Sequence, residues 1–234
     1  MSERFLELDA LRGIAVILMV VFHFLFDLDY FKGYSFNLSS GFWLFVGRSS
    51  ALVFLLLVGI SLTLSLSKGR SFKHFLERGV KIFALGLIIT ALTLLLFPQE
   101  TIWFGVLHLI GVSVILAFPF LKFKRLNVLL GFLIIAIGLV LWNLSFGFSW
   151  LLPLGFQPEG FVSFDYFPIL PSFGVVLLGI ALGNWAYAGG KRSFKPLKIE
   201  GSKPAKFIAF LGKHSLMIYV LHQPAIIALL LLMP

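Results

Sequence analysis

Four ionisable side chains near the start of the chain have the types and the spacing to do chemistry. Asp9, Arg12, His23 and Asp27 lie in an otherwise apolar stretch, residues 9–27, that is long enough to cross a bilayer. At about 100° per residue, a helix places all four within a sector of about 60°. Because ionisable groups are costly in hydrocarbon, this stripe is expected to face protein or a water-filled cavity.

Acid–base catalysis is the chemistry that this stripe predicts. His23 is a candidate general base, and Asp27, one helical turn further along, is a candidate acceptor for one imidazole nitrogen. The alternative is a structural ion pair between Asp9 and Arg12 that shares a face with a packed histidine. That alternative leaves His23 and Asp27 without an explanation inside the apolar segment.

Two more polar side chains are expected at about the depth of His23. Arg48 lies early in the second apolar segment, and His108 lies about two turns into the fourth. An arginine inside a span needs a partner or a cavity, which favours a functional role for Arg48. His108 is equally well explained as a hydrogen-bonded core histidine.

The last apolar segment carries a polar group of its own, formed by Tyr219, His222 and Gln223. His222 is expected near the middle of the membrane, where a polar side chain favours function. The structural alternative is a hydrogen bond from His222 to a backbone carbonyl that Pro224 leaves unpaired.

Composition indicates the class of protein. The 234 residues are 59% hydrophobic and 12% charged, which predicts a polytopic integral membrane protein. The absence of cysteine excludes disulfides, thiolate metal sites and a cysteine nucleophile. The net charge of +9 is better explained by basic cytoplasmic loops than by nucleic acid, so no nucleic-acid partner is expected.

Seven apolar segments are long enough to span a membrane, which predicts an all-α bundle of about seven transmembrane helices in a single domain, residues 1–234. The predicted spans are residues 9–28, 43–66, 79–97, 102–121, 126–144, 167–187 and 212–233. Gly174, Gly179 and Gly183 are expected to let helices approach closely. Small-residue faces of this kind also permit a homodimer.

The basic residues predict the orientation in the membrane. If every span crosses, sixteen of the nineteen Lys and Arg residues fall on one side. The positive-inside rule then places the N-terminus in the cytoplasm and the C-terminus outside the plasma membrane. The aromatic segment 144–167 would lie outside, either packed among membrane lipids at the interface or as a lid over an external substrate site.

The sequence does not support a phosphate-loop, dinucleotide or metal site. The sequence contains no Walker-type phosphate loop, no dinucleotide-binding glycine pattern and no HExxH motif. His23, His108 and His222 lie on separate spans without local ligand spacing, so no metal is expected.

Three stretches of the sequence resemble one enzyme family. RFLELDALRGIAVILMVVFHFLFDLDYF, FGVLHLIGVS and LGKHSLMIYVLHQP are similar to segments of the prokaryotic members of the heparan-α-glucosaminide N-acetyltransferase catalytic-domain family. The resemblance covers most of the chain and is strongest at its two ends. The spacing from Arg12 to His23 also resembles the arginine–histidine pattern of the acyltransferase-3 membrane enzymes. The lysosomal animal enzyme has no histidine at the position of His23.

The resemblance implies an integral membrane acyltransferase that moves an acyl group from cytoplasmic acyl-CoA, acetyl-CoA above all, to a glycan or lipid-linked sugar at the other face. Arg12 and the basic loops would meet the CoA phosphates, His23 would act as general base, and Arg48 or His108 would stabilise the oxyanion. The expected catalytic group is His23, Asp27, Arg48 and His108. The expected donor-binding group is Asp9, Arg12, Tyr219, His222 and Gln223. Direct transfer is preferred, and an acyl-histidine intermediate stays open.

Two other functions also stay open. A proton-coupled transporter would use Asp9, Arg12, His23 and Asp27 as a relay and would not bind CoA. A non-catalytic membrane scaffold would need these residues for stability alone.

Overall fold

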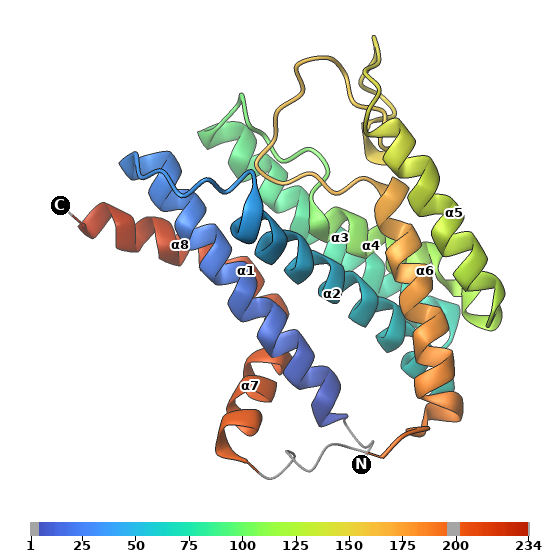
Figure 1. Ribbon diagram of the computed structural model, residues 1–234. Helices are drawn as coiled ribbons and strands as arrows, with labels where there is room; N and C mark the ends of the chain where they lie inside the picture. The colour runs from blue at the N-terminus through green and yellow to red at the C-terminus, as the bar shows by residue number, and fades with distance from the viewer. Residues whose placement is uncertain (1–4, 196–201, 234) are drawn as a thin grey trace. The chain divides into compact units, whose positions relative to one another are not determined.

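The structure is a computed structural model that describes residues 5–195 and 202–233. These residues form helices joined by turns and loops, with one isolated β-bridge and no strand in this part of the chain (Figure 1). The α-helices are α1 (Leu6–Lys32), α2 (Gly41–Ser67), α3 (Phe72–Leu96), α4 (Val106–Leu116), α5 (Leu126–Leu141), α6 (Ile169–Ala186), α7 (Lys203–Lys213) and α8 (Ser215–Leu232). The short 3₁₀ helices are η1 (Phe118–Lys122), η2 (Leu152–Leu154) and η3 (Ala188–Gly190).

The all-helical membrane bundle predicted from the sequence is confirmed. Within the described residues, five helices are long and apolar enough to cross a membrane, namely α1, α2, α3, α6 and α8. The predicted spans 102–121 and 126–144 correspond to shorter apolar helices, the 11-residue α4 and the 16-residue α5. The sequence analysis did not predict α7, because its lysines interrupt the apolar pattern.

Packing divides the chain into two compact units, which are described separately. The first unit, Met1–Phe54 with Lys195–Pro234, holds α1, the first half of α2, α7 and α8. The second unit, Leu55–Phe194, holds the second half of α2 and the helices from α3 to α6. The single domain expected over residues 1–234 stays a prediction.

In the first unit, α7 packs against the first turns of α1 and α8 packs against its C-terminal half. A methyl group at Gly212 of α7 would overlap the carbonyl oxygen of Asp9, and one at Gly13 of α1 would overlap that of Ile208. Glycine at both positions therefore lets the two backbones touch. The contact between α1 and α8 is apolar and centres on Leu28.

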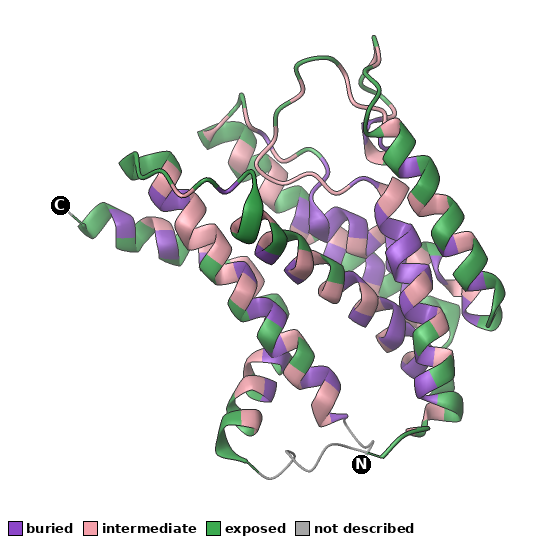
Figure 2. Ribbon diagram, in the orientation of Figure 1, coloured by how far each residue is buried: buried purple, intermediate pink, exposed green. Residues whose placement is uncertain are grey.

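In the second unit, the core lies along α4 and α6, where buried residues are concentrated (Figure 2). Its side chains with 0% exposure include Leu109, Val114, Val176, Leu177 and Ile180. The outer helix α5 instead exposes large apolar side chains such as Phe132, at 60%, and Val140, at 62%. An exposed apolar surface of this kind suits contact with lipid hydrocarbon.

The close approach predicted for Gly174, Gly179 and Gly183 is confirmed. Each faces a neighbouring helix so closely that an added methyl group would overlap an atom across the contact. The facing residues are Gly131 of α5, and Leu56 and Thr63 of α2. Small residues thus set the spacing of the helices around α6.

The segment between α5 and α6, predicted as an interfacial element or a lid, is packed and hydrogen-bonded. The Phe146 N–H donates to the Gln157 carbonyl (2.9 Å), and the Tyr166 hydroxyl donates to the Leu152 carbonyl (2.8 Å). Burial raises the pKa of the Tyr166 phenol, so it stays protonated and keeps this bond. Trp150 is 74% exposed, as expected of an aromatic side chain at a membrane interface.

The same segment is anchored to the connection between α3 and α4. The Phe164 N–H donates to the Glu100 carbonyl (3.0 Å). The Asp165 carboxylate accepts from the Val106 N–H (2.9 Å), which is a donor of the first turn of α4. These bonds favour an interfacial element fixed to the second unit over a freely moving lid.

We expect Gly59→Ala to destabilise the second unit. A methyl group at Gly59 would overlap the Val176 carbonyl and lie 2.6 Å from the Ile180 nitrogen, so α2 and α6 would have to move apart. The expected cost is about 1–3 kcal/mol, measured as a lower apparent melting temperature in detergent. Gly147→Ala is the control, because nothing lies within 4 Å of its added methyl. Equal melting temperatures for the two variants would contradict the packing described.

Candidate active site

Two histidines meet where α1 and α8 pack together. The rings of His23 on α1 and His222 on α8 have centroids 4.8 Å apart and are nearly perpendicular, at 83°. His23 is half-buried and His222 is buried, at 8% exposure. The sequence analysis expected these residues at different depths, and the structure brings them into contact.

The hydrogen bonds of the two imidazoles establish their tautomers. Nδ1 of His23 lies 2.8 Å from the carbonyl oxygen of Met19, and Nδ1 of His222 lies 2.6 Å from that of Tyr219. A carbonyl oxygen only accepts, so Nδ1 carries the proton in both rings. In the neutral imidazoles, both Nε2 atoms are therefore unprotonated and able to act as bases.

The orienting partner of His23 differs from the prediction. Asp27 was expected to accept from its imidazole, but the structure gives that role to the Met19 carbonyl, one turn earlier on the same helix. Asp27 is 2% exposed, and its Oδ1 instead accepts from Nε2 of Gln223 on α8 (3.3 Å). The carboxylate thus links α1 to α8 one turn beyond the histidine pair.

Three buried polar atoms in this cluster have no hydrogen-bond partner within the described chain. They are His222 Nε2, Asp27 Oδ2 and Gln223 Oε1. Leaving one such atom unpaired costs about 1–3 kcal/mol of folding free energy, so three of them in one cluster need an explanation. All three are hydrogen-bond acceptors, which suits a bound group that is rich in N–H or O–H donors.

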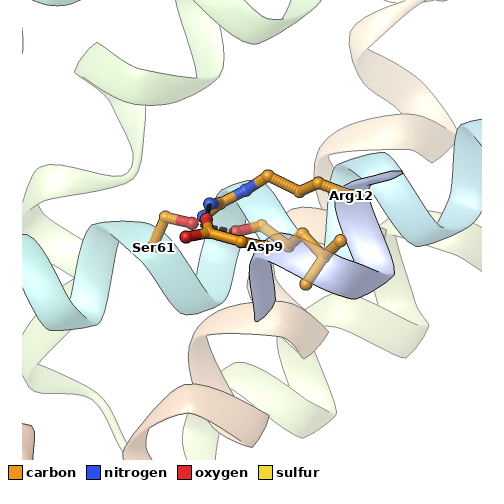
Figure 3. A network of polar contacts seen from close by, with 4 residues as sticks. Asp9, Arg12 and Ser61 are labelled. Atoms are coloured by element: carbon orange, nitrogen blue, oxygen red, sulfur yellow. Dashed lines mark hydrogen bonds and ion pairs between the residues drawn. The ribbon is translucent and has the colours of Figure 1, made fainter. Parts of the chain in front are cut away.

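An ion pair lies near the other end of α1. Nη1 of Arg12 donates to Oδ1 of Asp9 at 2.6 Å, as Figure 3 shows. The side chain of Asp9 is 9% exposed and that of Arg12 is 26% exposed. Arg12 and His23 lie eleven residues apart on one unbroken helix, which separates them by about 16 Å along its axis.

Arg48 also belongs to the first unit. The Ser50 hydroxyl donates to the Ala15 carbonyl (2.9 Å), and a methyl at Gly47 would lie 2.9 Å from the ring of Phe22. These two contacts place this turn of α2 beside α1 between Ala15 and Phe22, the neighbour of His23. The Arg48 side chain is exposed there and makes no hydrogen bond or ion pair with the described residues.

His108 lies in the second unit, where both of its ring nitrogens are used. Nδ1 accepts from the Gly105 N–H (3.2 Å), so Nε2 carries the proton and donates to the Thr90 hydroxyl (3.3 Å). That hydroxyl in turn donates to the Ile102 carbonyl (2.6 Å). The network fixes the start of α4 against α3, and the catalytic role expected for His108 stays a prediction.

A family model described as heparan-α-glucosaminide N-acetyltransferase, catalytic, matches residues 4–224. The chain belongs to this family. No curated protein and no solved structure matches the chain.

Membership in the heparan-α-glucosaminide N-acetyltransferase family agrees with the resemblance found in the sequence and with the membrane-spanning helices. Members are membrane acetyltransferases, and the match includes both units of this chain. All of the predicted site residues except His108 lie in the first unit. Within the described residues, no group of His, Cys, Asp and Glu is arranged to hold a metal ion.

Sequence reasoning missed three features of this N-acetyltransferase family member. The Met19 carbonyl orients His23, but a backbone acceptor leaves no mark in the sequence beyond its position four residues earlier on the helix. Asp165 supports the start of α4, and its only signal was a lone carboxylate in an aromatic segment. The contact between His23 and His222 depends on the packing of α8, which spacing along the chain does not reveal.

We expect His222→Phe to leave the melting temperature unchanged or higher. Phenylalanine keeps a ring beside His23 and removes the buried Nε2 that has no partner, so the free energy of unfolding should not fall. Differential scanning fluorimetry in detergent measures this. Leu230→Ala on the same helix is the positive control, expected to cost about 2–5 kcal/mol because Leu230 is 3% exposed. A loss with His222→Phe as large as that with Leu230→Ala would mean that His222 is structural.

Proposed function

We propose that the chain transfers an acetyl group from cytoplasmic acetyl-CoA to an extracytoplasmic sugar or glycan acceptor. The observation that carries this proposal is the tautomer of His23. Its Nδ1–H is held by the Met19 carbonyl, which leaves Nε2 unprotonated beside a second imidazole with the same tautomer. A general base needs such an oriented, unprotonated nitrogen.

The unpaired atoms favour an amine or hydroxyl as the group that is acetylated. His222 Nε2, Asp27 Oδ2 and Gln223 Oε1 all accept hydrogen bonds, and an incoming amine or hydroxyl supplies the N–H or O–H donors that they lack. The family to which the chain belongs is named for an N-acetyltransferase that acts on a glucosaminide. The acceptor that we propose is therefore a glycan or lipid-linked sugar with a free amine or hydroxyl.

The proposed proton path runs through His23. Nε2 of His23 takes the proton of the acceptor amine or hydroxyl as that group forms a bond to the acetyl carbonyl carbon. The bond from this carbon to sulfur then breaks, and His23 returns the proton to the departing thiolate to give the free thiol. His222, in ring contact with His23, has the same tautomer and offers a second unprotonated nitrogen. Arg48 is the candidate to stabilise the carbonyl oxygen as it gains charge.

Arg12 is the residue that we assign to the donor phosphates. Asp9 holds the Arg12 guanidinium through one nitrogen, and a planar guanidinium matches the geometry of a phosphate group. The distance of about 16 Å along α1 from Arg12 to His23 requires a long, thin donor arm between them, as in the pantetheine of CoA. In the proposed orientation, Arg12 lies near the cytoplasmic face of the plasma membrane and Asp27 near the opposite face.

The first test is acetyl transfer by the purified full chain from radiolabelled acetyl-CoA to glucosamine. We expect His23→Gln to lower the rate at least about 100-fold, because the general base is lost. Acetyl-CoA binding, measured by calorimetry, should persist in His23→Gln and weaken in Arg12→Ala. His74→Gln is the matched control, since His74 lies on α3 outside the proposed site.

Two outcomes would contradict the proposal. Wild-type protein that is folded but does not bind acetyl-CoA would favour the transporter or the scaffold. Equal rates for His23→Gln and His74→Gln would remove His23 from the chemistry.

The proposed orientation predicts the labelling of introduced cysteines. The natural chain has no cysteine, so Lys124→Cys and Ser35→Cys each provide one thiol, and both positions are exposed. In intact cells, a membrane-impermeant maleimide should label Ser35→Cys, and Lys124→Cys should react only after lysis. Labelling with the opposite pattern would invert the topology and place Arg12 at the outer face.

A further inference from the structure

Helix α7 presents an exposed face that is both basic and aromatic. Lys203, Lys206 and Lys213 are exposed, and so are Phe207, at 62%, and Phe210, at 55%. At about 100° per residue, these five side chains fall within a sector of about 120°. Two large aromatic rings among lysines are a poor surface for water, because their apolar area stays unburied.

The opposite face of α7 is already occupied. Ala209 and Gly212 are buried, and the helix packs against α1 through the contact of Gly212 with the Asp9 carbonyl. The Ser202 hydroxyl accepts from the Ala205 N–H (3.3 Å) and caps the first turn. The helix is therefore held by its small-residue face, and the basic, aromatic face points away from α1.

The position of α7 in the chain places it at a membrane boundary. It ends at Lys213, and the spanning helix α8 begins at Ser215. It packs against the first turns of the spanning helix α1, so two spans start beside it. Its 11 residues extend about 16 Å, which is too short to cross the bilayer.

We propose that α7 is an interfacial helix that binds anionic lipid headgroups. Phe207 and Phe210 enter the boundary between headgroups and acyl chains, and the three lysines reach lipid phosphates on flexible stems. Charge complementarity favours anionic over zwitterionic lipid, since the face carries three positive charges and no acidic residue occurs in α7. Binding to a protein partner would not explain why this face of α7 lies beside the starts of two membrane spans.

The first test titrates phosphatidylglycerol into the detergent-solubilised full chain and counts bound lipid by native mass spectrometry. Each lysine near an anionic surface contributes about 5-fold in affinity, so we expect Lys203→Gln with Lys206→Gln and Lys213→Gln to weaken binding about 10- to 100-fold. The control removes the same charge from Lys81, Lys124 and Lys191, which are exposed in other elements. An equal loss in both triple variants would overturn a site on α7.

Inorganic phosphate and coenzyme A are titrated against the same variants to distinguish lipid from soluble phosphate. We expect neither to displace phosphatidylglycerol from the wild type. Loss of coenzyme A affinity in the α7 variant, with phosphatidylglycerol affinity retained, would overturn the lipid assignment and give these lysines to the donor.

The second test measures the depth of the aromatic side chains in the membrane. A bimane label on Phe207→Cys, in nanodiscs with phosphatidylglycerol, should be quenched by lipids that carry a nitroxide near the headgroup and shielded from aqueous iodide. Lys206→Cys, on the same helix, is the matched control and should be more accessible to iodide. Equal iodide quenching at both positions would mean that Phe207 faces water, and the proposal would fail.

Discussion

N–H donors buried among apolar helices need hydrogen-bond acceptors, and this constraint shapes the site on α1 and α8. His23 and His222 meet it locally, each by donating from Nδ1 to a carbonyl on its own helix. Because that bond fixes the tautomer, it also leaves Nε2 of each ring unprotonated. The hydrogen bond that holds each ring in place is therefore also the one that determines its tautomer.

Close backbone contact is a second constraint on the packing of the helices. Gly13 and Gly212 let α7 touch α1, while Gly179 and Gly183 let α6 touch α2. Between helices that are apolar on all sides, shape complementarity replaces the hydrophobic driving force as the source of specificity. The glycines therefore set how closely these two pairs of helices approach.

The polar groups of the two units differ in their hydrogen-bond partners. The first unit contains the histidine pair, the Asp27–Gln223 bond and the Asp9–Arg12 ion pair. In the second unit, polar groups such as His108 and Asp165 are used to start α4 and to anchor the aromatic segment. Both ring nitrogens of His108 are hydrogen-bonded, whereas His23 and His222 each keep an unprotonated Nε2. The difference lies in their hydrogen-bond partners.

The sequence by itself determined the membrane class, the helical fold, the family resemblance and the stripe on α1. These follow from apolar segment length and from angular spacing within one helix, both of which are local properties. It did not reveal α7, whose lysines break the apolar pattern, or the true lengths of α4 and α5. Only the tertiary structure decided that His222 contacts His23, that Met19 orients the ring and that Asp27 bonds Gln223. The two pairings that join α1 to α8 depend on how α8 is rotated against α1, and helix rotation is set by packing across the contact. The bond from His23 to Met19 lies within α1 and depends on the rotamer of His23.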